Sequence, residues 1–84
     1  MDKKEILAIV RSSHENDAPL TCAMSELLIN LGIMRLELDE KDPSIILYRI
    51  DIDDIIKNDI DPDYLYDKGW KVSDDEESIF KIIG

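Results

Sequence analysis

The sequence predicts an α+β fold: two N-terminal amphipathic helices packed on an antiparallel sheet of about four strands, with a short helix between its two hairpins. Apolar residues recur at helical spacing before Gly32 and alternate with polar residues after it. Two acidic turns in the second part each separate a pair of β-rich segments, which is typical of hairpins. The chain has 84 residues, so we expect a single small domain over residues 1–84 with one thin core.

The first helix is predicted over Lys3–Ser13, with Asp2 as its N-cap. Its apolar stripe contains Ile6, Ile9 and Val10. The polar stretch 14–19 ends it.

The second helix is expected to begin at Leu20 or Thr21 and to run to Leu31. Gly32 followed by the apolar Ile33 predicts a left-handed helix end with a hydrophobic contact behind it. The residues of the expected buried face share the i, i+3, i+4 spacing: Leu20, Ala23, Met24, Leu27, Leu28 and Leu31.

The first hairpin follows Gly32. Met34, Leu36 and Leu38 alternate with charged residues, which predicts a strand with one face in solvent. Residues 39–43 form an acidic turn that contains Pro43, and Ile45–Ile50 is the second strand.

Residues 51–58 fit either a short helix or a loop, and the sequence leaves this open. Asp61 before Pro62 is typical of a capped helix start, so a short helix is predicted over Pro62–Lys68, with Gly69 as its stop.

The last segment favours a hairpin with strands Trp70–Val72 and Ser78–Ile83. In the alternative, Ser73 and Glu76 form a capping box for a C-terminal helix. A helix, a glycine, a hairpin and an acidic turn thus occur twice, once around Gly32 and once around Gly69. This could be an internal repeat, or only the common way to end a helix and start a hairpin.

The charge is distributed unevenly. Residues 1–36 contain five acidic and four basic side chains, whereas residues 37–84 contain fifteen and six, so −9 of the net charge of −10 lies in the second part. Such a surface attracts cations and basic proteins and repels phosphate and anionic lipid. We therefore expect a basic protein partner, with no direct nucleic-acid binding and no membrane association.

The sequence favours a non-enzymatic protein-interaction or regulatory module that presents an acidic, aromatic-containing surface. Trp70 and Phe80 are expected in the core. The candidate interaction residues combine carboxylates with tyrosines: Asp51, Asp53, Asp54, Asp59, Asp61, Asp63, Tyr64, Tyr66 and Asp67.

A calcium loop beginning at Asp59 is excluded, because Tyr64 occupies its required glycine position and Trp70 its required glutamate position. His14 and Cys22 show no third group that would make them a catalytic pair. No metal, cofactor or catalytic residue is therefore predicted, and the chain is not expected to be an enzyme. Two alternatives stay open: a nucleic-acid mimic that inhibits a nucleic-acid-binding protein, and a small cysteine-dependent or metal-assisted enzyme.

The single cysteine and the lack of a secretory or membrane-spanning segment favour a cytoplasmic location. Because one small core buries limited surface, self-association into a homo-oligomer is a further expectation.

Overall fold

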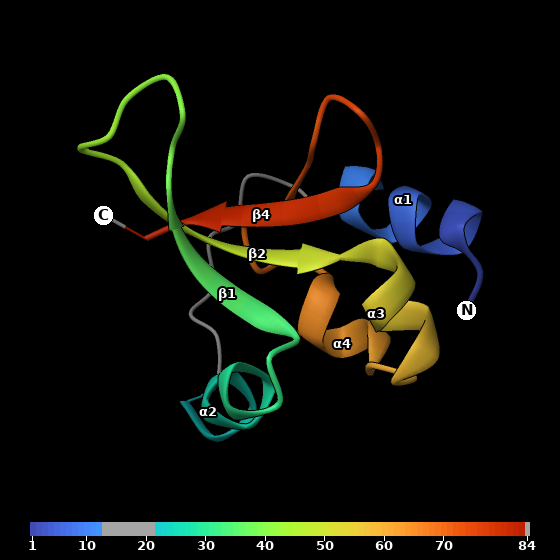
Figure 1. Cartoon of the computed structure of the whole chain (residues 1–84). Coiled ribbons are helices and arrows are strands. Elements are labelled where there is room, and N and C mark those ends of the chain that lie inside the picture. Colours follow the sequence, from blue (N-terminus) through green and yellow to red (C-terminus); the bar gives the residue numbers. More distant parts are fainter. Residues whose placement is uncertain (13–21, 84) are drawn as a thin grey trace.

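Four antiparallel strands form one sheet in the order β1-β2-β4-β3, and the helices cover part of one face (Figure 1). The computed structural model describes residues 1–12 and 22–83. Within these ranges the elements are α1 (Lys3–Ser12), α2 (Cys22–Asn30), β1 (Met34–Leu38), β2 (Ile46–Asp51), α3 (Ile52–Lys57), α4 (Pro62–Leu65), β3 (Lys71–Val72) and β4 (Ser78–Ile82). The predicted α+β fold is confirmed.

Helix α1 begins as its sequence predicts. The carboxylate of Asp2 accepts a hydrogen bond of 2.8 Å from the backbone N–H of Glu5, which satisfies one of the free N–H groups of the first turn. Ile6, Leu7 and Val10 are buried on one side of the helix. The predicted end at Ser13 lies outside the described residues.

Helix α2 ends in the predicted left-handed turn. Gly32 has a φ of 74°, the N–H of Ile33 donates to the carbonyl of Leu28, and the N–H of Gly32 donates to that of Ile29. Ile33 and Leu28 are both buried, which supplies the hydrophobic contact of this motif. The predicted start at Leu20 or Thr21 lies outside the described residues.

The predicted buried face of α2 is wrong in part. Leu28 is buried and Met24 is partly buried, but Ala23, Leu27 and Leu31 are exposed. The helix packs on the core through Met24, Leu28 and its C-terminal turn, and contacts β1. The spacing identifies the apolar stripe correctly, but the neighbouring elements are too few to cover its full width.

In the β1–β2 hairpin, Met34 lies opposite Ile50 and Leu38 opposite Ile46. Asp39 and Asp42 stabilise the turn by accepting the N–H groups of Lys41 and Ser44. The expectation of one buried face holds only at one end of β1, since Met34 is buried whereas Leu36 and Leu38 are 62% and 60% exposed.

Residues 51–58, which fit helix or loop in the sequence, form α3. Helix α4 begins at Pro62, as predicted, but ends at Leu65 rather than Lys68. Gly69 is therefore not its stop. Tyr66 ends the helix, because its backbone is extended at ψ 132°.

The β3–β4 segment forms the predicted hairpin and not the alternative helix. Ser73 does not cap a helix. Its hydroxyl accepts the N–H of Ser78 and donates to the carboxylate of Asp75, which closes the turn. Trp70 precedes β3 rather than belonging to it.

Along the described chain the element order α-α-β-β occurs twice. The two hairpins join through β2 and β4, so the second strand of each hairpin lies at the centre of the sheet. The two units differ in their helices, because α4 is much shorter than α2.

One aromatic residue of the predicted core is placed differently. Trp70 is buried and its indole N–H donates to the carbonyl of Tyr64 at 3.2 Å. Phe80 lies on the opposite face of the sheet, partly buried under the guanidinium of Arg49, which is 5.7 Å from the ring centroid. The alternation along β4 explains this, since the neighbouring residue Ile79 occupies the core face.

The two ends of β2 offer a matched test of how far the core extends along the sheet. Ile50 is fully buried and Ile46 is 37% exposed, on the same face of the same strand. We expect Ile50→Val to lower the free energy of unfolding by about 0.5–1.5 kcal/mol, because it removes a packed methyl group. Ile46→Val should change it by less than about 0.5 kcal/mol. Urea unfolding would measure both, and equal losses would contradict the one-sided core.

Candidate functional site

The predicted acidic residues lie mainly in one segment, which contains α3, α4 and the turn between them. Residues 51–67 contain seven aspartates and one basic side chain, Lys57. Five of these aspartates lie between residues 53 and 63, where Asp54 is half-exposed and the other four are exposed, and we call them the acidic corner: Asp53, Asp54, Asp59, Asp61 and Asp63. The segment is anchored by the buried side chains of Ile52, Ile55, Ile60, Tyr64 and Leu65.

Two residues of the acidic corner have local structural roles. Asp59 has a φ of 49°, and the N–H groups of Asp59 and Ile60 donate to the carbonyls of Ile56 and Ile55. This is the same left-handed helix end as at Gly32, with aspartate in the glycine position. Asp61 is the N-cap of α4, because its carboxylate accepts the N–H of Asp63 at 2.9 Å.

Tyr64 is the clearest correction to the predicted surface. It is only 6% exposed, and its hydroxyl lies 3.0 Å from the hydroxyl of Ser25. Burial raises the pKa of Tyr64, and the hydrogen bond to Ser25 opposes that shift only in part. Tyr64 therefore belongs to the core, while Tyr66 is 45% exposed.

Asp51 and Asp67 also differ from the other predicted residues. Asp51 ends β2 on the sheet face opposite the helices, where both carboxylate oxygens accept hydrogen bonds of 3.1 Å from Arg35. Asp67 is half-buried, with a φ of 59°. Neither residue is an exposed carboxylate of the acidic corner.

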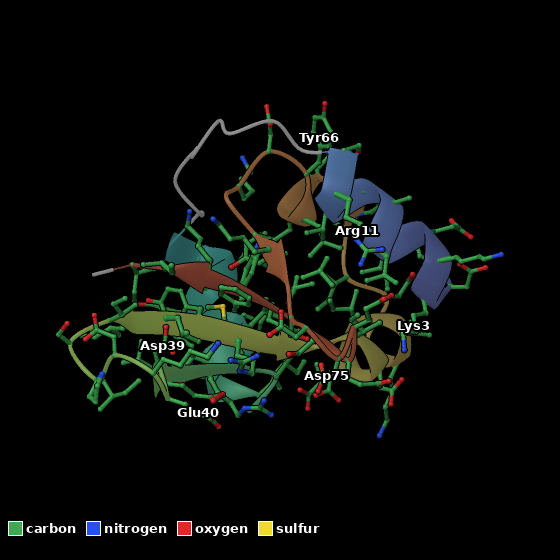
Figure 2. All side chains as sticks on the ribbon, turned by 90° about the horizontal axis from the view of Figure 1, so that it is seen from above. Lys3, Arg11, Asp39, Glu40, Tyr66 and Asp75 are labelled. Carbon is green, nitrogen blue, oxygen red and sulfur yellow. The ribbon has the colours of Figure 1, made fainter. Side chains whose placement is uncertain are left out.

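Outside the acidic corner, the described acidic side chains that form ion pairs are Glu37, Asp51, Glu76 and Glu77. Lys3 and Arg11 of α1 form ion pairs with Glu77 and Glu76 in the β3–β4 turn, at 3.0 and 3.6 Å. Figure 2 shows Lys3 and Arg11 on α1, with Asp75 in that turn. These exposed pairs contribute little to stability because water screens them, but they reduce the local negative field.

The open face of the sheet carries a balanced network. Glu37 lies 3.3 Å from Arg35 and 3.4 Å from Arg49, and Arg35 also binds Asp51. Because Arg35 and Arg49 are directly opposite in the β1–β2 register, the two carboxylates offset a repulsive pair. This network has no net charge.

One residue of the acidic corner, Asp53, contributes to the electrostatic environment of Lys3. The pKa of Lys3 is raised, first by its hydrogen bond to Glu77 and then by the charges of Glu77, Glu76 and Asp53. In the part of the chain that the structure describes, no ion pair joins a basic group to an aspartate of the acidic corner.

The His, Cys, Asp and Glu side chains of residues 1–12 and 22–83 do not gather into a metal site. No group of three or more His, Cys, Asp or Glu side chains in these ranges could hold a metal ion. The pair His14 and Cys22 is not placed, because His14 and the side chain of Cys22 lie outside the described structure. None of the described helices is long and apolar enough to cross a membrane.

Sequence reasoning missed a set of exposed apolar residues at the other end of the sheet. Leu36 and Leu38 of β1 are largely exposed, with Ile46 and Ile83 close to them in the ladder. Leu27 and Leu31 of the neighbouring α2 are also exposed. The sequence did contain a signal for this exposure. The alternation of apolar residues along the strands is longer than the stretch that two short helices can cover.

The role of Asp59 can be tested by substitution. We expect Asp59→Gly to raise the free energy of unfolding by up to about 1 kcal/mol, because glycine adopts a positive φ without the steric cost. Asp63→Gly removes the same charge from within α4 and should lower that free energy by about 0.5–1 kcal/mol. Urea unfolding measures both, and destabilisation by Asp59→Gly would show that the carboxylate itself matters.

The Asp75 carboxylate provides a pH test. Its pKa is lowered, first by the hydrogen bond from the Ser73 hydroxyl and then by the N–H of Glu77. Because the folded pKa is below the unfolded value, its contribution to stability is present above the unfolded pKa and is lost as pH falls through the folded one. Ser73→Ala should raise the pKa of Asp75 in an NMR titration. Asp42, whose pKa is lowered by Ser44, should not change and serves as the internal control.

Comparison with family models, with curated proteins and with solved structures found no match for this chain. A functional conclusion therefore depends on the charges and the geometry of the described residues.

Proposed function

We propose that the protein is a non-enzymatic interaction module that binds a basic protein partner through the acidic corner. The observation that supports this most is the density of acids without an ion pair in this segment. Glu37, Glu76 and Glu77 pair with arginine or lysine of the same chain, whereas the corner gathers five aspartates between residues 53 and 63, none of which forms an ion pair within the described structure. A basic partner would supply the missing countercharge.

The scaffold of the corner supports the same proposal. The aspartates belong to α3, α4 and a turn whose apolar residues Ile55, Ile60 and Leu65 are buried. Their backbone is therefore ordered before a partner arrives, which lowers the entropy cost of binding. A fixed negative field also accelerates the encounter with a basic partner.

Two exposed side chains of the same segment suit an interface. Ile56 on α3 is 40% exposed, and Tyr66 follows α4 (Figure 2). Tyrosine is enriched among residues that dominate interface energetics, because it combines a large apolar surface with a polar group. Because Tyr64 is buried, Tyr66 is the tyrosine of this segment that can contact a partner.

The nucleic-acid mimic has less support. Most of the exposed acids fall into three separate segments, the β1–β2 turn, the acidic corner and the β3–β4 turn, and others lie at α1 and on α2. Figure 2 shows Asp39 and Glu40 at one end of the sheet and Asp75 toward the other. Several of these carboxylates also accept hydrogen bonds from their own turns, as Asp39 and Asp75 do. A mimic would instead need a continuous row of free carboxylates at phosphate spacing.

The proposal predicts that binding depends on where the negative charges lie, and not only on their number. We expect the quadruple variant Asp53→Asn, Asp54→Asn, Asp59→Asn and Asp63→Asn to lose at least about tenfold in affinity for a basic partner captured from a lysate of the source cells. Binding of the unmodified protein should weaken steeply with salt.

The matched control removes four charges elsewhere, by Glu26→Gln, Asp39→Asn, Glu40→Gln and Asp74→Asn. These residues lie on α2 and in the two hairpin turns. The control variant should retain most of the affinity, measured by titration calorimetry with the captured partner. If both variants lose affinity equally, total charge and not the acidic corner drives binding. If no protein is captured in a salt-sensitive way, the proposed function fails.

A further inference from the structure

Strand β1 is an edge strand of the sheet and pairs with β2 on its inner side (Figure 1). The N–H of Asp39 donates to the carbonyl of Ile45, so Asp39 belongs to a hydrogen-bonded pair of the β1–β2 ladder. Because such pairs alternate along antiparallel strands, Glu37 and Arg35 also direct their backbone groups toward β2. Leu36 and Leu38 therefore direct their N–H and carbonyl groups away from the sheet.

This free border is also apolar. Leu36 and Leu38 are the exposed residues of β1 on the core face, beyond the point where Met34 is covered. Natural edge strands usually carry protection, such as inward-pointing charges, proline or a covering element. Leu36 and Leu38 are neither charged nor proline, and their exposure shows that α2 does not cover them.

The charges of β1 favour a symmetric pairing centred on Leu36. In an antiparallel pair of two identical strands centred on Leu36, Leu36 faces its own copy and Met34 faces Leu38 of the other chain. On the opposite face, Arg35 of each chain then lies across from Glu37 of the other. Shifting the centre to Arg35 or to Glu37 would instead place like charges opposite each other, which is unfavourable.

The centred register also satisfies the backbone. Leu36 and Leu38 present outward hydrogen-bonding groups, and a centre on Leu36 brings these groups together as hydrogen-bonded pairs. Arg35 uses three of its N–H groups within the chain, toward Glu37 and Asp51, and a guanidinium has five. Donors therefore remain for Glu37 of the second copy.

The strongly negative chain must pair where repulsion is weakest. The β1 strand itself carries one arginine and one glutamate and has no net charge. Continuing the register past the strand ends places the acidic turn of one copy beside residues 31–33 of the other. That segment contains Leu31, Gly32 and Ile33 and has no charged side chain.

We propose that two copies of this chain associate through β1, in an antiparallel register centred on Leu36, to form one continuous eight-stranded sheet. The interface is isologous, so each contact occurs twice. It pairs the free backbone groups of the edge strand and covers Leu36 and Leu38. Helix α2, whose Leu27 and Leu31 are also exposed, contacts β1. This inference is independent of the acidic corner, which belongs to another part of the chain.

The first test is the mass of the full chain, measured by sedimentation equilibrium over a wide concentration range. The unmodified protein should show twice the chain mass of 9.7 kDa at high concentration. Leu36→Lys places two ammonium groups opposite each other at the symmetry axis and should leave only monomer. Ile56→Lys, the same change at an exposed position of α3, should still dimerise. An unmodified protein that stays monomeric at every concentration would overturn the proposal.

The second test examines the register. Arg35→Glu alone and Glu37→Arg alone each create two repulsive pairs, and each should raise the dimer dissociation constant at least about tenfold. Mixing the two variants restores opposite charges at both positions, so the mixture should form a heterodimer. Lys71→Glu, a charge reversal on the other edge strand, is the control and should leave dimerisation unchanged. Circular dichroism melting would confirm that each variant is folded.

Two results would contradict the proposed register. A mixture that remains monomeric would show that Arg35 and Glu37 do not face each other across the interface. A dimer that is unaffected by Leu36→Lys, or that is lost in Lys71→Glu, would show that the copies associate through another surface. Loss of dimerisation leaves the affinity of the acidic corner for its basic partner unchanged, so the two proposals fail separately.

Discussion

The buried side chain of Tyr64 connects parts of the chain that are far apart in sequence. Its hydroxyl lies 3.0 Å from the hydroxyl of Ser25 in α2 and 3.9 Å from the sulfur of Met34 in β1. Its carbonyl accepts the indole N–H of Trp70, whose ring centroid is 6.4 Å from that of Tyr64. These contacts hold the four-residue helix α4, which would have no stability of its own. The position of α4, with Asp61 and Asp63 of the acidic corner, therefore depends on this tyrosine.

The small size of the chain explains why only part of the sheet is covered. A domain of this length buries a limited fraction of its surface, and its core gathers where α1, α3 and α4 meet the sheet. Met34, Ile50 and Ile79 lie within that core, whereas Leu36, Leu38 and Ile46 extend beyond it on the same face. Apolar residues at this end of the strands are exposed because the sheet extends beyond the helices that cover it.

The surface charge of each region depends on which acids form ion pairs as well as on the local composition. Lys3, Arg11, Arg35 and Arg49 all bind carboxylates of the β3–β4 turn or of the sheet. Lys57 is the base of the segment that contains the acidic corner. The acidic second part of the chain thus forms a nearly neutral sheet face and a more negative corner. The aspartates at helix ends and turns also have conformational roles, as Asp59, Asp61 and Asp75 illustrate.

The sequence by itself determined where most elements begin and end. Asp2, Gly32 with Ile33, and Asp61 with Pro62 mark the helix ends correctly, because a cap acts on backbone groups only a few residues away. Both hairpins were predictable from alternation and acidic turns for the same local reason. Only the tertiary structure decided which residues of these elements are covered. Leu27 and Leu36 fit an apolar pattern yet are exposed, Tyr64 was expected at the surface yet is buried, and Asp51 binds Arg35 from the neighbouring strand. Burial and ion pairing depend on which distant segment lies opposite a side chain, and spacing along one element contains no information about that.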